Sequence, residues 1–178
     1  MKKRRFPSVV IGVFVLLILV AILVAIILTS GKGDEKESTV HTDDTLEWVL
    51  DRAEKIAGTD LEHGEVVRFS DTHGGFLGDG DVFLELQYSD EDYKQIEEQI
   101  STQKKYLEEL PMAEELARYL MGWDFEVPQS GYYLFYDRHG DADDRHDYKE
   151  MGERASRNFS VIILDQDAKK IIYFEMDT

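Results

Sequence analysis

The feature that most constrains this chain is an uninterrupted apolar run near its amino terminus. Val9 to Leu28 are twenty consecutive residues, of which only Gly12 is neither aliphatic nor aromatic. A helix of that length rises about 30 Å, which matches the hydrocarbon core of a bilayer, and it satisfies its own backbone hydrogen bonds. The sequence therefore predicts a transmembrane helix over residues 9–29.

Charged residues before the run predict its orientation. Residues 1–8 contain four basic side chains and no acidic one, and short basic flanks remain in the cytoplasm. We therefore expect a cytoplasmic tail over residues 1–8 and a carboxy-terminal domain outside the cell membrane. The alternative is a secretory signal cleaved near residues 29–31, although the apolar region of a signal is usually about 7 to 15 residues long. Lipoprotein processing is excluded because the chain contains no cysteine.

The charge balance limits the classes of partner. The chain holds 20 Lys and Arg against 37 Asp and Glu, a net formal charge of −17, and four of the basic residues precede the apolar run. The remainder is strongly anionic, which argues against nucleic acid and anionic lipid headgroups as partners. The lack of cysteine also excludes disulfides, thiol catalysis and cysteine-ligated metal sites.

Beyond the apolar run, the chain is predicted to form a linker and one domain. Residues 30–43 are polar and lack hydrophobic periodicity, which is typical of a flexible linker. Residues 44–178 have the usual length of a single domain. No Pro/Gly/Ser-rich break divides them.

Hydrophobic periodicity predicts the elements of this domain. Helices are expected over 44–57, from Ser89 along a stripe that continues to Leu107 and Leu110, and from Pro111 to Gly122. Strands are expected over 65–70, 82–88, 131–137, 158–164 and 170–176, the last two joined by a tight turn. This order predicts an α+β fold with a largely antiparallel sheet of about five strands and two to three helices on one face.

Two copies of the pattern F-x-D-x-H-G end predicted strands. They place Asp71 and His73 in one loop and Asp137 and His139 in another. Residues two apart in extended backbone point to the same side, so each loop could present a carboxylate and an imidazole together. If the two strand ends are neighbours, the four residues could hold a divalent metal ion, the one cofactor that the pattern allows. The alternative is that both loops are turns in which Asp bonds its own backbone.

The first copy resembles the opening motif of calcineurin-like metallophosphoesterases, in which D-x-H supplies metal ligands. The resemblance covers only residues 69–81, and the later G-N-H-[DE] and G-H-x-H motifs of that family are missing. Taken together, the apolar anchor, the DTHGG…GDGD loop, the SDED helix start and the FYDRH strand end resemble small uncharacterised membrane-anchored proteins of Gram-positive bacteria. That resemblance implies a place at the cell surface and no activity.

Two classes of function follow. The favoured one is a non-catalytic extracytoplasmic module that binds a surface protein, a cell-wall component or a small ligand, with the loops DTHGGFLGDGD and DRHGDADDRHD as its binding edge. The alternative is a metal-dependent hydrolase on the same two loops. In that case Asp81 or Glu85 would be its general base.

Overall fold

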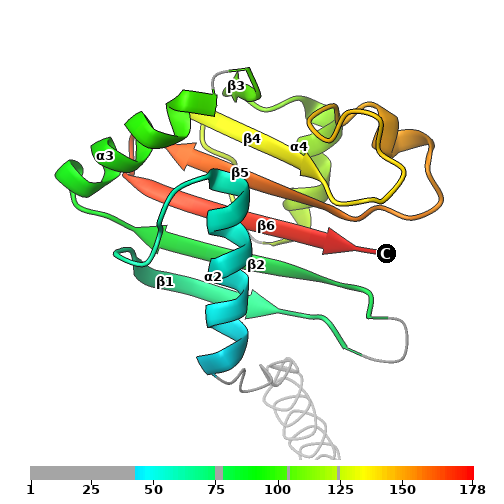
Figure 1. Ribbon diagram of the computed structural model, residues 1–178, viewed down its shortest axis with the longest axis horizontal. Coiled ribbons are helices and arrows are strands. Elements are labelled where there is room, and N and C mark those ends of the chain that lie inside the picture. The colour runs from blue at the N-terminus through cyan, green and yellow to red at the C-terminus, as the bar shows by residue number, and fades with distance from the viewer. Residues whose placement is uncertain (1–42, 75–77, 104, 124) are drawn as a thin grey trace, which may run out of the picture. The chain divides into compact units, whose positions relative to one another are not determined.

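The computed structural model describes residues 43–74, 78–103, 105–123 and 125–178, all within one compact unit, His41–Thr178. Six strands form one sheet in the order β1-β2-β6-β5-β4-β3, in which each neighbouring pair is antiparallel (Figure 1). The predicted α+β class and antiparallel sheet are confirmed. The bounds of the strands are β1 Glu65–Asp71, β2 Gly80–Gln87, β3 Leu107–Glu109, β4 Gly131–Asp137, β5 Phe159–Asp165 and β6 Lys170–Asp177.

The described part contains three α-helices, and local capping signals mark the end of the first and the start of the second. They are α2 Asp43–Ala57, α3 Asp90–Ile100 and α4 Glu114–Leu120. Helix α2 stops at Gly58, whose φ of 69° suits glycine in the left-handed region. Helix α3 starts after Ser89, whose side chain accepts a hydrogen bond from the backbone N–H of Asp92. Short 3₁₀ turns η1 Ser101–Gln103, η2 Met121–Trp123 and η3 Glu150–Glu153 complete the helical segments.

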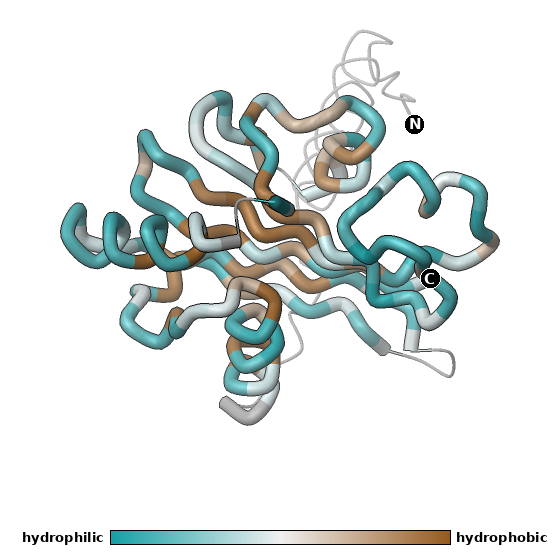
Figure 2. The backbone as a smooth tube through the Cα atoms, turned by 45° about the horizontal axis from the view of Figure 1, so that its top comes forward, coloured by the Kyte–Doolittle hydropathy of each residue, from teal (hydrophilic) through white to brown (hydrophobic). Residues whose placement is uncertain are grey.

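The helices cover both faces of the sheet, which corrects the prediction that they lie on one face. Helices α2 and α3 pack against one core, which contains Val49 and Ile96 together with sheet residues such as Leu84. Helix α4 packs through Leu116 and Leu120 against a second core on the opposite face. Figure 2 shows the apolar strands between these layers. The strands alternate apolar residues toward both sides, so each face needed its own cover.

The segment after α3 also differs from the prediction. Leu107 was expected on the helical stripe, but the helix ends at Ile100 and Leu107–Glu109 forms β3, which pairs with the outer edge of β4. Without β3, the outer edge of β4 would have unpaired backbone N–H and C=O groups. Pairing with them outweighs the helical spacing of Leu107 and Leu110. Helix α4 begins at Glu114 rather than at Pro111.

The amino-terminal predictions fall outside the described residues. This holds for the tail 1–8, the span 9–29 and the linker 30–43 apart from Asp43, which is the first residue of α2. Over the residues that the structure does describe, no helix combines the length and the hydrophobicity needed to cross a membrane.

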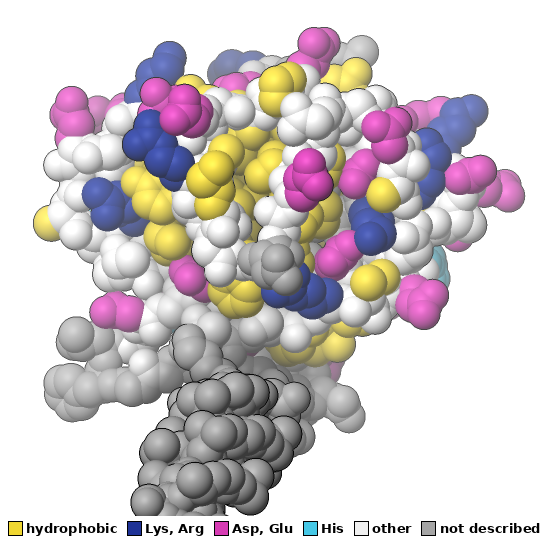
Figure 3. Space-filling view, turned by 180° about the vertical axis from the view of Figure 1, so that it is seen from behind, with side chains coloured by type: hydrophobic (Ala, Val, Ile, Leu, Met, Phe, Trp, Pro, Cys, Tyr) yellow, Lys and Arg dark blue, Asp and Glu magenta, His cyan; other side chains and the backbone are white. Residues whose placement is uncertain are grey.

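The face of the sheet opposite α2 carries an apolar groove beside α4. Figure 3 shows apolar side chains gathered around a hollow on this side of the molecule. The groove has a volume of about 660 Å³, and Met121 on its wall is 68% exposed. Its apolar lining consists of Pro111, Met112, Ala117, Met121, Phe125 and Val127.

Candidate functional site

Polar side chains gather at one end of the sheet, on the face that α2 covers. Cross-strand partners along this row, from β1 to β4, are Asp71, Val82, Glu175, Ser160 and Tyr136. Residues directly opposite each other in antiparallel strands point to the same face, and Val82 belongs to the core under α2. The row therefore places two carboxylates and two hydroxyl groups on the α2 side of the sheet.

Glu175 lies at the centre of the row and is fully buried. Its Oε1 accepts a hydrogen bond from Arg52 of α2 and lies 3.4 Å from Nη2 of Arg138. Its Oε2 accepts from the hydroxyl of Tyr173, which is 3.0 Å from the Ser160 hydroxyl. A buried carboxylate persists only where it is paired and hydrogen-bonded. The two arginines and the tyrosine meet that condition and connect α2 to β6.

The Tyr173 hydroxyl is a fixed donor in this network. Burial raises its pKa, and the negative charge of Glu175 and their hydrogen bond raise it further. The hydroxyl therefore stays protonated at neutral pH and donates a hydrogen bond to Glu175.

His73 joins two strands through carboxylates. Its Nδ1 lies 2.8 Å from Asp71 Oδ1, and its Nε2 lies 3.1 Å from Asp177 Oδ2. Asp71 Oδ1 also accepts the backbone N–H of His73 at 2.8 Å. The other oxygen of Asp177 accepts from Nη2 of Arg138 at 2.7 Å. Asp177 thus links the end of β1 to the loop that follows β4.

The second D-x-H loop forms a separate arrangement on the opposite face. Asp137 is 1% exposed, and its direct cross-strand partner is Phe159 of the core under α4. One oxygen of Asp137 accepts the backbone N–H of His139 at 2.9 Å, and the other pairs with Arg154. The ring of His139 accepts the backbone N–H of Asp141 at 3.3 Å. This loop is an Asx turn held by a buried ion pair.

The structure does not bring the two D-x-H loops together into one site. They end strands β1 and β4, which are separated in the sheet by β2, β6 and β5. Four strand spacings of about 4.8 Å place them about 19 Å apart, whereas metal–ligand bonds are near 2 Å. Asp71 also points to the α2 face while Asp137 points to the α4 face. Asp71, His73, Asp137 and His139 therefore cannot share one metal ion.

The candidate general bases also lie on the far face from His73. Asp81 and Glu85 pair with Met176 and Ile172, which pack in the core under α4. Burial raises the pKa of the Asp81 carboxyl, and Glu85 Oε1 accepts from Lys170 Nζ at 2.6 Å. His73 is near enough to oppose part of the rise in the Asp81 pKa, but the Asp81 side chain bonds to Trp123 and takes no part in the hydrogen bonds of His73 with Asp71 and Asp177.

A different set of ligand atoms does meet at the end of the sheet. His73, Glu175 and Asp177 each offer one atom, and these atoms lie within 4.8 Å of one another. The set has the chemistry of a metal site, since imidazole and carboxylates bind divalent ions. However, Nη2 of Arg138 lies 3.4 Å from Glu175 and 2.7 Å from Asp177, so a guanidinium already supplies positive charge there.

A cavity of about 330 Å³ opens beside this network, between α2 and the end of β4. We call it the cationic cavity. Over the described residues it is lined by Arg52, Lys55, Ile56, Tyr136, Arg138 and His146, three permanent cations with no carboxylate among them. Two of these residues, Arg138 and His146, come from the loop DRHGDADDRHD that the sequence indicated as part of a binding edge.

Donors remain in the walls of the cationic cavity after the internal hydrogen bonds are formed. The Arg138 side chain contacts Glu175, Asp177 and backbone carbonyls through its Nη2 atom. Its buried Nε has no hydrogen-bond partner in the described part of the chain. His146 stacks on Tyr106 at 3.8 Å, and its Nδ1 lies 2.9 Å from the carbonyl oxygen of Phe135. A carbonyl only accepts, so Nδ1 carries the hydrogen, and Nε2 is the remaining nitrogen, an acceptor while the ring is neutral.

Sequence reasoning missed most of this site. Arg52 and Lys55 lie on one side of α2 and were not singled out, and Glu175 was part of a strand pattern. One signal was available: Glu175 stands in the run KIIYFEM, where a charged residue occurs within an otherwise apolar strand. Buried charges are rarely unpaired, so this position already implied cationic partners elsewhere in the chain.

Comparison with known proteins adds no neighbour to this description. No protein-family model, curated protein or solved structure matches the chain.

Proposed function

We propose that the domain of residues 43–178 is a non-catalytic binding module that takes a small organic anion into the cationic cavity. One observation carries this proposal. Arg52, Lys55 and Arg138 converge on a cavity in which no described lining residue is a carboxylate, although acidic residues outnumber basic ones in the chain by 37 to 20. In so acidic a molecule, a concave surface of opposite sign favours an anionic ligand.

The cavity offers complementary groups for a carboxylate or phosphate. Guanidinium groups bind such anions through several directed N–H donors, and a lysine adds a point charge. Tyr136 and His146 add flat surfaces against which the body of the ligand can pack. A volume of about 330 Å³ is at the lower end for ligand pockets, so the ligand should be small.

The alternative of a metal-dependent hydrolase has less support. The two D-x-H loops lie on different strands and opposite faces. The remaining triad of His73, Glu175 and Asp177 faces the Arg138 guanidinium, which would repel a cation. This geometry favours binding over catalysis.

The test is titration of the full-length chain, purified in a non-ionic detergent, with succinate and with inorganic phosphate. We expect saturable binding of at least one of them that weakens as salt is added, because charge attraction is screened. Lys55→Gln should weaken it about tenfold through loss of one charge-assisted hydrogen bond. The Lys55 side chain is 72% exposed, and its ion pair is with the exposed Asp51, so the variant should fold normally.

Lys94→Gln is the matched control for this titration. Lys94 is 74% exposed and also forms an i,i+4 ion pair, with Glu98, but it lies on α3 outside the cationic cavity. Its loss changes the net charge equally and should leave the affinity unchanged. Equal weakening by the two variants, or no saturable binding by either anion, would contradict the proposal.

We also propose that this module lies outside the cell membrane, held by residues 9–29 with the tail 1–8 in the cytoplasm. The apolar run and its basic flank support this. A protease added to intact cells should remove a carboxy-terminal tag. Protection of the tag in intact cells and cleavage only after lysis would reverse the proposed orientation.

A further inference from the structure

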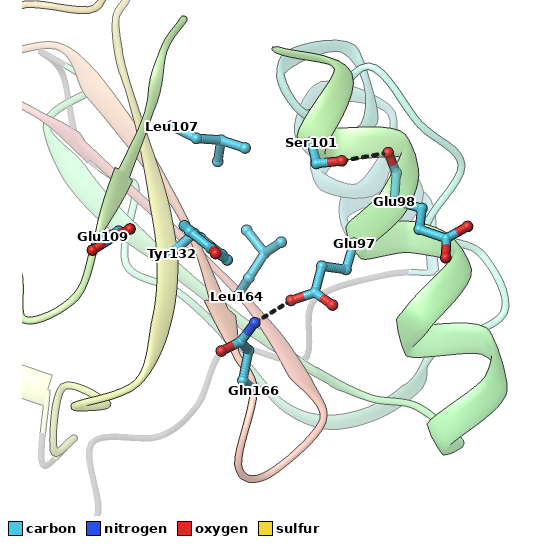
Figure 4. A pocket seen from close by; sticks show the side chains of 8 residues that line it. All are labelled: Glu97, Glu98, Ser101, Leu107, Glu109, Tyr132, Leu164 and Gln166. Atoms are coloured by element: carbon cyan, nitrogen blue, oxygen red, sulfur yellow. Dashed lines mark hydrogen bonds between the residues drawn. The ribbon is translucent and has the colours of Figure 1, made fainter. Parts of the chain in front are cut away.

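A second cavity lies on the same side of the sheet, between the end of α3 and strands β3 and β4. Its volume is about 410 Å³. Figure 4 shows Leu107, Tyr132 and Leu164 pointing into its centre from three strands, while Glu97 of α3 closes one side and meets Gln166. Gln166 Nε2 donates to Glu97 Oε1 and thereby holds that carboxylate at the cavity. The cavity combines an apolar floor with one oriented carboxylate.

The charge around this cavity is opposite to that of the cationic cavity. Among the described residues, its charged lining residues are Glu97, Glu98 and Glu109, and none is Lys or Arg. Helix α3 ends here with no basic residue in its last turn, so no side chain of that turn offsets the negative end of the helix dipole. A positively charged ligand would relieve both effects.

A buried hydroxyl lies near this cavity without lining it: burial raises the pKa of Tyr93, and the nearby lining residues Glu97 and Tyr132 raise it further. Tyr93 is 2% exposed, and its hydroxyl has no hydrogen-bond partner in the described part of the chain. Tyr93 precedes Glu97 by four residues on α3, so the two share one face of the helix. Buried polar atoms are almost always paired, and an unpaired one calls for a missing water or ligand group.

The carboxylates do not converge in the way that a metal ion requires. Figure 4 shows Glu98 pointing away from the cavity centre and Glu109 on the far wall, across from Glu97. Among the described residues, these three glutamates form no group with ligand atoms close enough for one ion. The Ser101 hydroxyl is also engaged, since it donates to the Glu98 carbonyl at 2.8 Å. The geometry therefore suits a cation with a hydrocarbon body better than a bare ion.

We infer that this cavity binds an organic monocation, a primary ammonium on a short alkyl chain such as a lysine side chain. The ammonium would pair with Glu97, and the methylene groups would lie against Leu107, Tyr132 and Leu164. This site is separate from the cationic cavity. Tyr132 and Tyr136, which mark the two cavities, are four residues apart on β4, about 13 Å along the strand.

The experiment is calorimetric titration of the full-length chain in non-ionic detergent with n-pentylamine, against n-pentanol as the neutral probe of equal length. We expect saturable binding of the amine at millimolar concentration and at least tenfold weaker binding of the alcohol, because only the amine forms the charge-assisted hydrogen bond. Glu97→Gln should reduce the affinity for the amine about tenfold. Equal binding of the two probes would overturn the inference.

Two control variants separate direct contact from general charge. Glu91→Gln removes the same charge from the same helix, but Glu91 is exposed in the first turn of α3 and does not line the cavity, so it should leave the affinity for the amine nearly unchanged. Equal losses for Glu97→Gln and Glu91→Gln would overturn the inference in favour of a diffuse field. Lys55→Gln, which tests the cationic cavity, should not affect amine binding, so failure of one site can be told from failure of the other.

Discussion

Glu175→Ala should lower the free energy of unfolding by about 3–5 kcal/mol, the usual cost of removing one partner from a buried ion pair. Glu175 is fully buried, and its removal leaves Arg52 and Arg138 without their shared carboxylate and the Tyr173 hydroxyl without its carboxylate acceptor. Thermal unfolding of the full-length chain should show a drop in Tm of about 10–15 °C.

Two further variants test whether the buried charge is responsible. Glu175→Gln keeps the size of the side chain and one acceptor oxygen, so it should lose less stability than Glu175→Ala. Asp51→Ala breaks the exposed ion pair with Lys55, in which both side chains are more than half exposed, and it should cost less than about 0.5 kcal/mol. If Glu175→Ala melted like Asp51→Ala, the network would not stabilise the fold.

Asp137→Ala should cost about 3 kcal/mol or more, through a different set of contacts. Asp137 is 1% exposed, pairs with Arg154 and accepts the backbone N–H of His139. Its loss leaves Arg154, whose side chain is 17% exposed, with Glu150 as its remaining ion-pair partner in the part of the chain that the structure describes. Urea unfolding should show a lower midpoint with an unchanged slope.

A double-mutant cycle separates the two roles of Asp137. In Asp137→Ala combined with Arg154→Ala, no uncompensated charge remains, so the double variant should lose clearly less stability than the sum of the two single variants. Asp137→Asn keeps an oxygen that can accept the His139 backbone N–H but removes the negative charge. Its loss of stability therefore measures the ion pair separately from the turn. Strict additivity in the cycle would mean that the pair itself contributes nothing.

The elements of the domain were largely predictable because they depend on local spacing. The apolar residues of α2 recur at helical intervals, Ser89 supplies a hydrogen-bonding cap for α3, and the alternating strands bury one or both faces. Strand β3 was not predictable in the same way. Leu107–Glu109 is too short to show a period, and its pairing depends on β4, which follows more than 20 residues later.

The candidate site was far less predictable than the elements. The cationic cavity combines Arg52 and Lys55 of α2 with Tyr136, Arg138 and His146, which lie more than 80 residues further along the chain. No local pattern relates these positions, because they meet only after α2 packs across the sheet. The D-x-H loops, which local pattern did single out, proved to be two separate arrangements.

By itself, the sequence determined which residues share a side of each element, but not which layer that side would face. The two F-x-D-x-H-G copies have the same local geometry, with Phe69 and Asp71 on one side of β1 and Phe135 and Asp137 on one side of β4. The tertiary structure turned the first side toward α2 and the second toward α4, and it inserted β6 between β2 and β5. The reason is physical: backbone alternation is set within a strand, whereas its face and its neighbours are set by strand register and by the packing of helices onto both cores.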